Sequence, residues 1–199
     1  KLFFRKVLFF FLKKIRRNIG FIAKADIKFD NIKFKKIKNP INSYLADPFI
    51  FNHNNKDYIF AEEYEIKKNK GLISVYEITE NLPKRIGIIL EEKFHLSFPY
   101  MFNFNDKIYM VPESSQNKDI RLYECVNFPN KWKLKKILLN NISAVDTLIF
   151  YKNNFWWLLT NTDSAETGDF NSELSIYYSK NEFITDNWKP HKLNPLYTD

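Results

Sequence analysis

The chain has 199 residues, of which 45% are hydrophobic and 18% aromatic, so it can build a buried core and disorder is excluded. Residues 1–38 hold 13 Lys and Arg against two Asp, whereas residues 39–199 hold 18 basic and 21 acidic residues. The net charge of +8 therefore belongs to the N-terminal segment, and without a recognition motif beside it we expect no nucleic-acid partner. The single cysteine, Cys125, excludes an internal disulfide and fits a cytoplasmic location.

Residues 1–17 are predicted to form a short basic amphipathic helix, with apolar residues on one face and Lys and Arg on the other. The longest apolar run, Val7–Leu12, is far shorter than the ~20 residues of a membrane span. No small-residue cleavage site follows it, so the segment matches a secretory signal poorly. Two interpretations are open: the helix lies on an anionic membrane surface, or it packs on a neighbouring domain.

Residues 18–199 are predicted to form one domain, and its main signal is a strand–turn–strand module that occurs three times without gaps. The copies are DPFIFNHNNKDYIFAE (47–62), FPYMFNFNDKIYMVPE (98–113) and DTLIFYKNNFWWLLTN (146–161), which start 51 and then 48 residues apart. A period near 50 residues built on β-hairpins is typical of a β-propeller, in which each repeat forms one blade.

Further strands complete each repeat. Third strands are predicted at 71–78, 119–126 and 173–179, and fourth strands at 85–92, 131–139 and 187–193. The sequence thus predicts an all-β fold with three four-stranded blades at about 45–92, 97–139 and 145–193. Strand candidates in 18–38 are assigned to a blade that closes the ring. Because propellers have 4–8 blades, we expect additional blades or a further domain after Asp199.

The two ends of each module are expected to meet on one rim of the propeller, because strands 1 and 2 of a blade form a hairpin. Clustered carboxylates there suit acid–base chemistry on a glycosidic bond, since like charges in a partly buried site raise one pKa. We therefore predict Asp47, Glu113 and Asp146 as catalytic residues, and Glu62 and Glu63 as substrate-binding residues. The alternative is that these acids cap turns or are merely solvated.

Two further residues are candidates for substrate binding. His95 immediately precedes the first strand of the second blade, where it would bind a hydroxyl or a phosphate, or hold a loop. Trp157 could stack on a sugar ring, although packing between blades is the commoner use of Trp in such sheets. The sequence has no HExxH, no CxxC pair, no Gly-rich phosphate loop and no D-x-D motif. We therefore expect no metal and no cofactor, and no self-sufficient nucleotide-sugar transferase.

Several segments together resemble the N-terminal domain of plant glucosamine inositolphosphorylceramide transferases. They include LADPFIF, YIFAEEYE, HLSFPYMF, MVPESS and VDTLIFYKNNFWWLL, and the resemblance extends over roughly residues 18–199. Similar bacterial domains are associated with polysaccharide and glycolipid biosynthesis, and the chain is identified as a bacterial member. The resemblance implies a five-bladed propeller related in fold to family 43 and family 32 glycoside hydrolases.

The resemblance also implies roles for two residues. Asp47 in ADPF matches the general base of family 43 hydrolases, and Asp146 in AVDTLIF resembles the Asp that tunes the pKa of their acid. In those enzymes the general acid follows the second Asp along the chain, whereas Glu113 precedes Asp146. In the plant enzymes sugar transfer is attributed to a separate C-terminal domain.

The leading prediction is a carbohydrate-active or glycan-recognising propeller that acts in surface polysaccharide or glycolipid biosynthesis, on a sugar or glycolipid. If it is catalytic, Asp47 is the base or nucleophile, Glu113 the acid, and Asp146 the residue that holds their charges apart. The alternative is a non-catalytic glycan-binding or scaffolding module for a neighbouring glycosyltransferase or formyltransferase. A protein-interaction propeller, the third interpretation, predicts a large exposed apolar patch and no acidic site.

Overall fold

The computed structural model describes residues 19–21, 35–79, 83–170, 173–180 and 182–198. The helix predicted for residues 1–17 lies outside this part of the chain. In the described ranges the regular secondary structure consists of β-strands and one short 3-10 helix, Ser115–Asn117. No helix there is long and apolar enough to cross a membrane.

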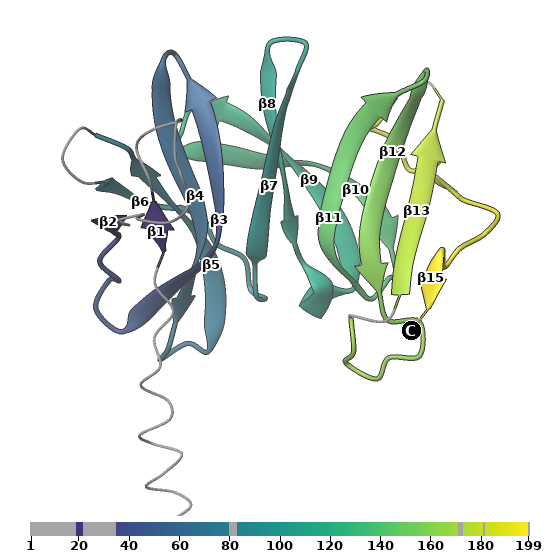
Figure 1. Cartoon of the computed structure of the whole chain (residues 1–199), viewed down its shortest axis with the longest axis horizontal. Coiled ribbons are helices and arrows are strands. Elements are labelled where there is room, and N and C mark those ends of the chain that lie inside the picture. Colours follow the sequence, from purple (N-terminus) through teal and green to yellow (C-terminus); the bar gives the residue numbers. More distant parts are fainter. Residues whose placement is uncertain (1–18, 22–34, 80–82, 171–172, 181, 199) are drawn as a thin grey trace, which may run out of the picture.

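Three antiparallel sheets stand side by side as blades (Figure 1). Blade 1 consists of β3 (Ser43–His53), β4 (Lys56–Glu65), β5 (Lys70–Glu77) and β6 (Lys84–Leu90). Blade 2 consists of β7 (Ser97–Phe104), β8 (Lys107–Glu113), β9 (Asp119–Asn127) and β10 (Lys131–Asn140). Blade 3 consists of β11 (Ala144–Lys152), β12 (Phe155–Thr162), β13 (Glu173–Ser179), β14 (Lys189–Pro190) and β15 (Tyr197–Thr198). The predicted all-β class is confirmed, while the number of blades in a complete ring stays a prediction.

The fourth strand of blade 3 is split, which the sequence pattern did not predict. Both β14 and β15 pair with β13. Between them the Asn194 side chain takes the place of a strand backbone: its Oδ1 accepts the N–H of Ile176 at 2.9 Å and its Nδ2 donates to the Ile176 carbonyl at 2.7 Å. An amide side chain carries the same donor and acceptor as a peptide group, so it can fill one rung of the ladder.

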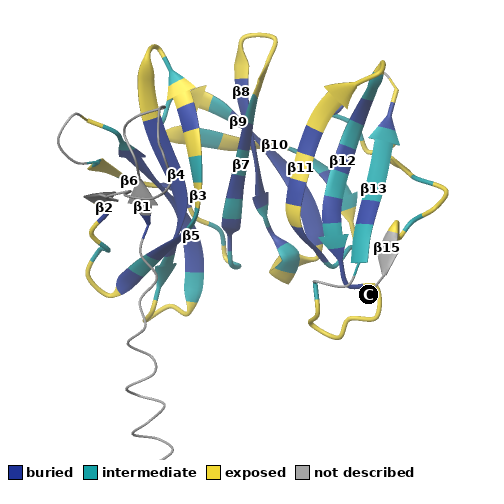
Figure 2. Cartoon of the chain, viewed as in Figure 1, coloured by how far each residue is buried: buried dark blue, intermediate teal, exposed yellow. Residues whose placement is uncertain are grey.

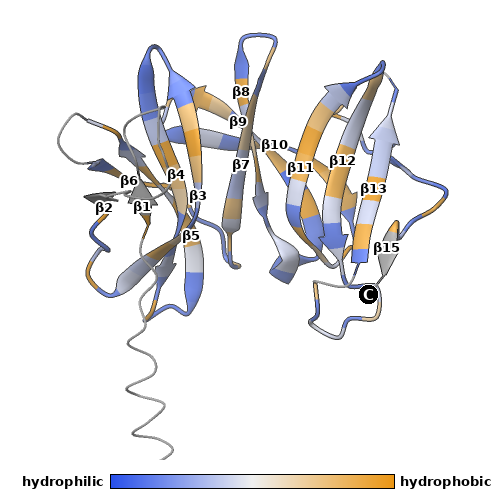
Figure 3. Cartoon of the chain, viewed as in Figure 1, coloured by the Kyte–Doolittle hydropathy of each residue, from blue (hydrophilic) through white to orange (hydrophobic). Residues whose placement is uncertain are grey.

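Strand alternation buries one apolar face of each blade against its neighbour (Figures 2 and 3). Phe60 and Val75 of blade 1 pack with Met101 and Met110 of blade 2. A second cluster joins blade 2 to blade 3 through residues such as Val111, Leu122, Ile149 and Leu158. These interfaces fix the angular position of the blades and hence of their rims.

The opposite side of blade 1 is covered by the N-terminal strands. β1 (Gly20–Phe21) and β2 (Lys35–Lys36) form an antiparallel pair. Their neighbours Ile19 and Ile37 are buried in a cluster with Leu45, Ile59, Ala61 and Tyr76 of blade 1. The assignment of residues 18–38 to a blade that closes the ring stays a prediction.

Candidate functional site

The ends of the repeated module meet on one rim, as the hairpin register requires. Glu62 pairs with Ala46, Glu113 pairs with Ser97, and Asn161 pairs with Val145. In each pair, the partner on the first strand directly precedes the first residue of the module, so the three pairs occupy equivalent positions in their blades. The carboxylates of the second strands and the first residues of the modules therefore share this rim.

A bulge interrupts the first strand of every blade at this same position. The register shifts between Ala46 and Phe49, between Ser97 and Tyr100, and between Val145 and Leu148. The residue that opens each bulge has a positive φ: 46° at Asp47, 42° at Phe98 and 54° at Asp146. This conformation is uncommon for non-glycine residues, and bulges redirect the side chains that they carry. The backbone thus gives Asp47 and Asp146 an orientation that strand alternation does not provide.

Glu113 is the electrostatic centre of the rim. Burial raises the pKa of its carboxyl group to about 7, a hydrogen bond from Ser115 opposes this rise, and the negative charge of Asp146 adds to it. The Ser97 hydroxyl also lowers this pKa, and Asp47 raises it further. The Ser115 Oγ donates to Glu113 Oε1 at 2.9 Å. Near neutral pH this carboxyl group therefore exchanges between its protonated and ionised forms, as a general acid or base requires.

Asp146 is coupled to the same charges. It reaches solvent, yet the protein packed around it raises its pKa, and the charge of Asp47 adds to the effect. The charge of Asp47 thus raises the pKa of both Glu113 and Asp146. The structure therefore brings the three predicted catalytic residues into one interacting cluster, here called the rim carboxylates.

His95 and Glu62 form a second group beside them. The Gly71 backbone N–H donates to His95 Nδ1 at 3.0 Å, so the neutral ring carries its proton on Nε2. That Nε2 lies 3.4 Å from Oε1 of the buried Glu62. Burial lowers the pKa of His95, while the charge of Asp47 opposes the shift. The imidazole is therefore a neutral hydrogen-bond donor at neutral pH.

Gly71 is a site residue that the sequence analysis missed. A Cβ atom on it would lie 2.3 Å from the Leu96 carbonyl oxygen, 2.8 Å from His95 Cε1 and 2.9 Å from Glu62 Oε1. No other residue can occupy this position without displacing His95 or the backbone. The available signal was its rarity, since the chain has only four glycines and this one begins a predicted strand.

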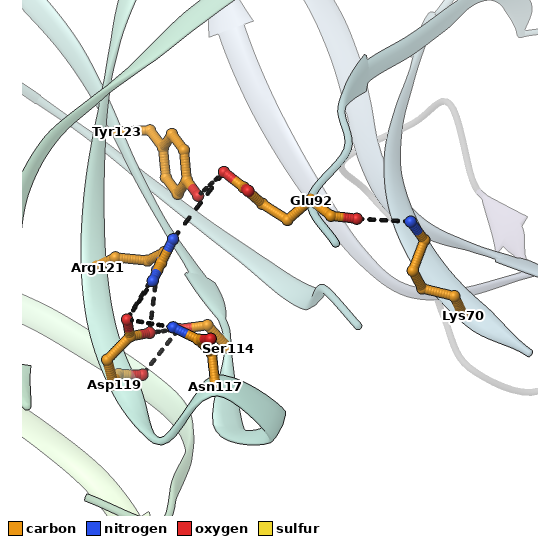
Figure 4. A network of polar contacts seen from close by, with 7 residues as sticks. All are labelled: Lys70, Glu92, Ser114, Asn117, Asp119, Arg121 and Tyr123. Atoms are coloured by element: carbon orange, nitrogen blue, oxygen red, sulfur yellow. Dashed lines mark hydrogen bonds and ion pairs between the residues drawn. The ribbon is translucent and has the colours of Figure 1, made fainter. Parts of the chain in front are cut away.

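A polar network anchors the connection from blade 1 to blade 2, which carries His95 (Figure 4). Lys70 Nζ donates to the Glu92 carbonyl at 2.5 Å, and the Tyr123 hydroxyl donates to Glu92 Oε1 at 2.7 Å. The Arg121 guanidinium lies 4.6 Å from the centre of the Phe94 ring. The connection is thus tied to the third strands of both blades, which fixes the position of His95.

The same network reaches Glu113. Arg121 and Asp119 form a buried ion pair with several hydrogen bonds. The Asp119 carboxylate also accepts hydrogen bonds from Ser114 Oγ and Asn117 Nδ2, each at 2.8 Å. Because Ser114 directly follows Glu113, this ion pair holds the end of the strand that carries the titrating carboxyl group.

Two predicted site residues lie elsewhere. Glu63 makes an ion pair with Arg85: Nη2 donates to its two carboxylate oxygens at 3.0 and 3.1 Å, and Nε donates to Oε2 at 3.3 Å. Trp157 is four residues along β12 from Asn161, about 13 Å at the rise of a β-strand. Its Nε1 donates to the Lys152 carbonyl at 3.0 Å. The structure brings neither side chain to the rim carboxylates.

Among the described residues, no three metal-ligating side chains gather in an arrangement that would hold a metal ion. The groups that the rim presents are carboxyl groups, one neutral imidazole and serine hydroxyls. These groups transfer protons and bind hydroxyl groups.

Comparison with known proteins identifies the family to which the chain belongs. Residues 32–199 match the family described as "Glucosamine inositolphosphorylceramide transferase 1, N-terminal". A protein of this name from Arabidopsis thaliana is 37% identical over 158 residues, which are 78% of this chain and 20% of the plant protein. The chain thus spans about a fifth of the length of this relative. The relatives found are plant proteins, and the expected bacterial membership stays a prediction.

Solved structures show the fold. A thermostable family-43 glycoside hydrolase has a TM-score of 0.58 at 11% identity, covering 78% of this chain and 56% of its own. An exo-beta-1,3-galactanase from Clostridium thermocellum has a TM-score of 0.61 at 15% identity, covering 76% of this chain and 36% of its own. The expected relationship to the propeller fold of family 43 hydrolases is confirmed, at the level of fold alone.

Proposed function

Because the chain belongs to the N-terminal family of glucosamine inositolphosphorylceramide transferase 1, we propose that it is a carbohydrate-active or glycan-recognising propeller domain. Its pathway would be surface polysaccharide or glycolipid biosynthesis, and its ligand a sugar or a glycolipid. The observation that carries this proposal is the position of Glu113, whose pKa is raised to about 7 beside Asp47 and Asp146. Relatives named as sugar transferases and neighbours that hydrolyse glycosides support the same class of ligand.

In the catalytic form of the proposal, the protonated Glu113 gives its proton to the oxygen of the departing group. Asp47, as base, accepts the proton of the incoming water or alcohol, or attacks the sugar carbon as nucleophile. Asp146 keeps its negative charge. This charge opposes ionisation of Glu113 and so keeps the proton on Glu113. Each of the three carboxyl groups then has one task.

Glu62 and His95 would bind the hydroxyl groups of the sugar. The buried carboxylate accepts hydrogen bonds and the imidazole Nε2–H donates them, a combination that matches a sugar hydroxyl. A phosphate is the poorer ligand, because the imidazole is neutral and the nearby carboxylates repel an anion. The proposal therefore favours an uncharged part of the substrate at this place.

The second candidate function is a non-catalytic glycan-binding or scaffolding module for a neighbouring glycosyltransferase or formyltransferase. One observation favours it: the chain spans about a fifth of a relative that is named as a transferase. Catalysis would then belong to another part of the polypeptide. Contact of residues 1–17 with an anionic membrane is compatible with either function.

Saturation-transfer NMR with neutral oligosaccharides and glycolipid headgroups, followed by product analysis, tests both functions. We expect binding by the native chain, weakened by Asp47→Asn and Asp146→Asn and unchanged by Glu182→Gln, an exposed control. A catalytic domain forms product and loses it in Glu113→Gln while keeping binding, whereas a binding module forms none. Absence of sugar binding, or equal binding by all variants, would contradict the proposal.

A further inference from the structure

A polar cavity of about 340 Å³ lies on the side of blade 3 that faces blade 2. Its walls come from the connection between β10 and β11, the loop that follows β12, the strand β13, and Asn194 with Pro195. Small-molecule sites typically have volumes of about 300–1,000 Å³, so the cavity has room for a small ligand. The rim carboxylates do not line it, which makes it a separate place from the site described above.

The repeat register identifies the equivalent place between blades 1 and 2. Tyr177 of β13 pairs with Leu158 of the third module copy. Tyr123 of β9 pairs with Met110, which has the same position in the second copy. Alternate residues of a strand share one face, so the match extends along the strand in steps of two. The matched residues are Tyr177 with Tyr123, Ser175 with Arg121, and Glu173 with Asp119.

Between blades 1 and 2 the chain itself fills this space. The Tyr123 hydroxyl donates to Glu92 Oε1 at 2.7 Å (Figure 4). The Arg121 guanidinium lies 4.6 Å from the centre of the Phe94 ring. Glu92 and Phe94 both belong to residues 91–96, which connect β6 to β7. The third strand of blade 2 is therefore covered, and its tyrosine hydroxyl has a carboxylate as partner.

Between blades 2 and 3 the same space is open. Ser175 stands where blade 2 has the much larger Arg121, and it lines the cavity. The connection from β10 to β11 is also shorter, since it consists of residues 141–143 alone. The Tyr177 hydroxyl makes no hydrogen bond with any described residue, and burial raises its pKa. The cavity thus exposes a hydroxyl group that has a partner in the preceding interface.

The other polar groups of the cavity suit a ligand rich in hydroxyl groups. Ser143 and Asn141 line it, and within the described part of the chain their side chains make no hydrogen bond. A hydroxyl group and a side-chain amide can each donate and accept. Together with the Tyr177 hydroxyl they offer both kinds of group to one bound molecule.

The charge of the cavity disfavours an anion. Among the described residues that line it there is no Lys, Arg or His, whereas Glu173 is one of its acids. The Ser164 hydroxyl donates to Glu173 Oε1 at 2.5 Å and lowers the pKa of this carboxyl group. Glu173 is therefore ionised at neutral pH and would repel a phosphate or a carboxylate.

We propose that this cavity is a second carbohydrate site, which binds one uncharged sugar residue of a glycan independently of the rim carboxylates. For its class of ligand this inference rests on the proposed function. The Tyr177 hydroxyl would donate to a sugar oxygen, as the Tyr123 hydroxyl donates to Glu92. Ser143 and Asn141 would bind neighbouring hydroxyl groups of the same sugar.

NMR titration of the chain with cellobiose, lactose and mannobiose tests the second site. The backbone amides of Asn141 and Ser164 report on the cavity, and the His95 ring reports on the rim. We expect at least one disaccharide to shift both cavity amides, with an affinity that Asp146→Asn leaves unchanged. A shift of the cavity amides without any shift of His95 would support the second site and contradict sugar binding at the rim.

Two variants and one matched control identify the binding groups. Tyr177→Phe removes one oxygen atom and should raise the Kd at the cavity by roughly 2- to 10-fold, the effect of one hydrogen bond. Ser175→Arg should abolish the shifts, because the new side chain fills the cavity and can pair with Glu173, as Arg121 pairs with Asp119. Tyr178→Phe, on the opposite face of β13, should leave the Kd unchanged.

Shifts confined to His95 would overturn the second site and leave the proposed function standing. Absence of a shift at Asn141 and Ser164 with all three disaccharides would also overturn it, as would an equal Kd for the native chain and Tyr177→Phe. Shifts of the cavity amides with calcium chloride and with none of the disaccharides would assign the cavity to a cation and contradict the proposed ligand.

Discussion

At the scale of single residues, the unusual group is a carboxyl group whose ionisation the fold opposes. Glu113 is partly buried and interacts with the charges of two further acids, and its two serine partners offset only part of the cost. A group with a pKa raised above its unfolded value contributes to stability below about pH 4.5, and that contribution is lost as the pH rises through about 7. The rim carboxylates are thus held together at a cost in stability, which is typical of sites that serve function.

Replacing Glu113 should therefore stabilise the protein in a pH-dependent way. We expect the free energy of unfolding of Glu113→Gln, relative to the native chain, to increase between pH 5 and pH 8 by up to roughly 3 kcal/mol. Urea denaturation at the two pH values measures it. Glu182→Gln is the control on the surface, for which no pH-dependent difference is expected. An equal effect of Glu113→Gln at both pH values would show that ionisation of this carboxyl group is not opposed.

Residue-level detail was only partly predictable from the sequence. The register of the module predicted that Asp47, Glu113 and Asp146 share a rim, because hairpin pairing depends on sequence spacing alone. The positive φ at Asp47 and Asp146 was not predictable, since nothing in DPF or DTL requires a bulge. The space that Gly71 leaves for His95 depends on two segments 24 residues apart, which no local pattern reveals.

At the scale of elements, the connection between blades 1 and 2 depends on one buried ion pair. Asp119 is 4% exposed and Arg121 is 7% exposed, and between them they hold the end of β8 and the segment that carries His95. The sequence analysis assigned third strands here correctly but gave no signal for this pair. The alternation of apolar and polar residues along a strand predicts which side chains are buried. It does not predict that buried Asp119 forms an ion pair with Arg121, two residues further along the chain.

Breaking this pair should be costly, whereas replacing both partners should not. Arg121→Met is expected to lower the free energy of unfolding by about 3–5 kcal/mol, because it leaves the Asp119 carboxylate buried without its countercharge. In the double variant Asp119→Leu with Arg121→Met, much of this loss should be recovered. Lys136→Met, which breaks an exposed ion pair with Asp186, should change stability by about 0.5 kcal/mol or less. Chemical denaturation of these proteins and of the single variant Asp119→Leu measures the coupling, and additive effects of Asp119→Leu and Arg121→Met would contradict it.

At the scale of the whole molecule, the chain combines a slightly acidic set of blades with a strongly basic N-terminal segment. The blades carry an acidic rim, whereas a protein-interaction propeller was expected to have a large exposed apolar patch and no acidic site. The acidic rim therefore favours the carbohydrate proposal.

The charge distribution makes a prediction about membranes. If residues 1–17 contact an anionic surface, replacing Lys13, Lys14, Arg16 and Arg17 by Gln should abolish sedimentation with phosphatidylserine vesicles and leave the Tm of the blades unchanged. High salt should weaken binding of the native chain, because ions screen charges beyond about 10 Å at 0.1 M. Neutral phosphatidylcholine vesicles are the control. Unchanged sedimentation of the variant would exclude a membrane role for this segment.

The central claim is that Asp47, Glu113 and Asp146 act as one electrostatic unit at the rim, and a carbon-13 NMR titration of the Glu113 carboxyl group tests it most directly. In the native chain the midpoint is predicted near pH 7, and it should fall in Asp146→Asn and in Asp47→Asn because each removes a negative charge that favours the proton. A midpoint near the ordinary value of a glutamate, unchanged by both substitutions, would contradict the claim.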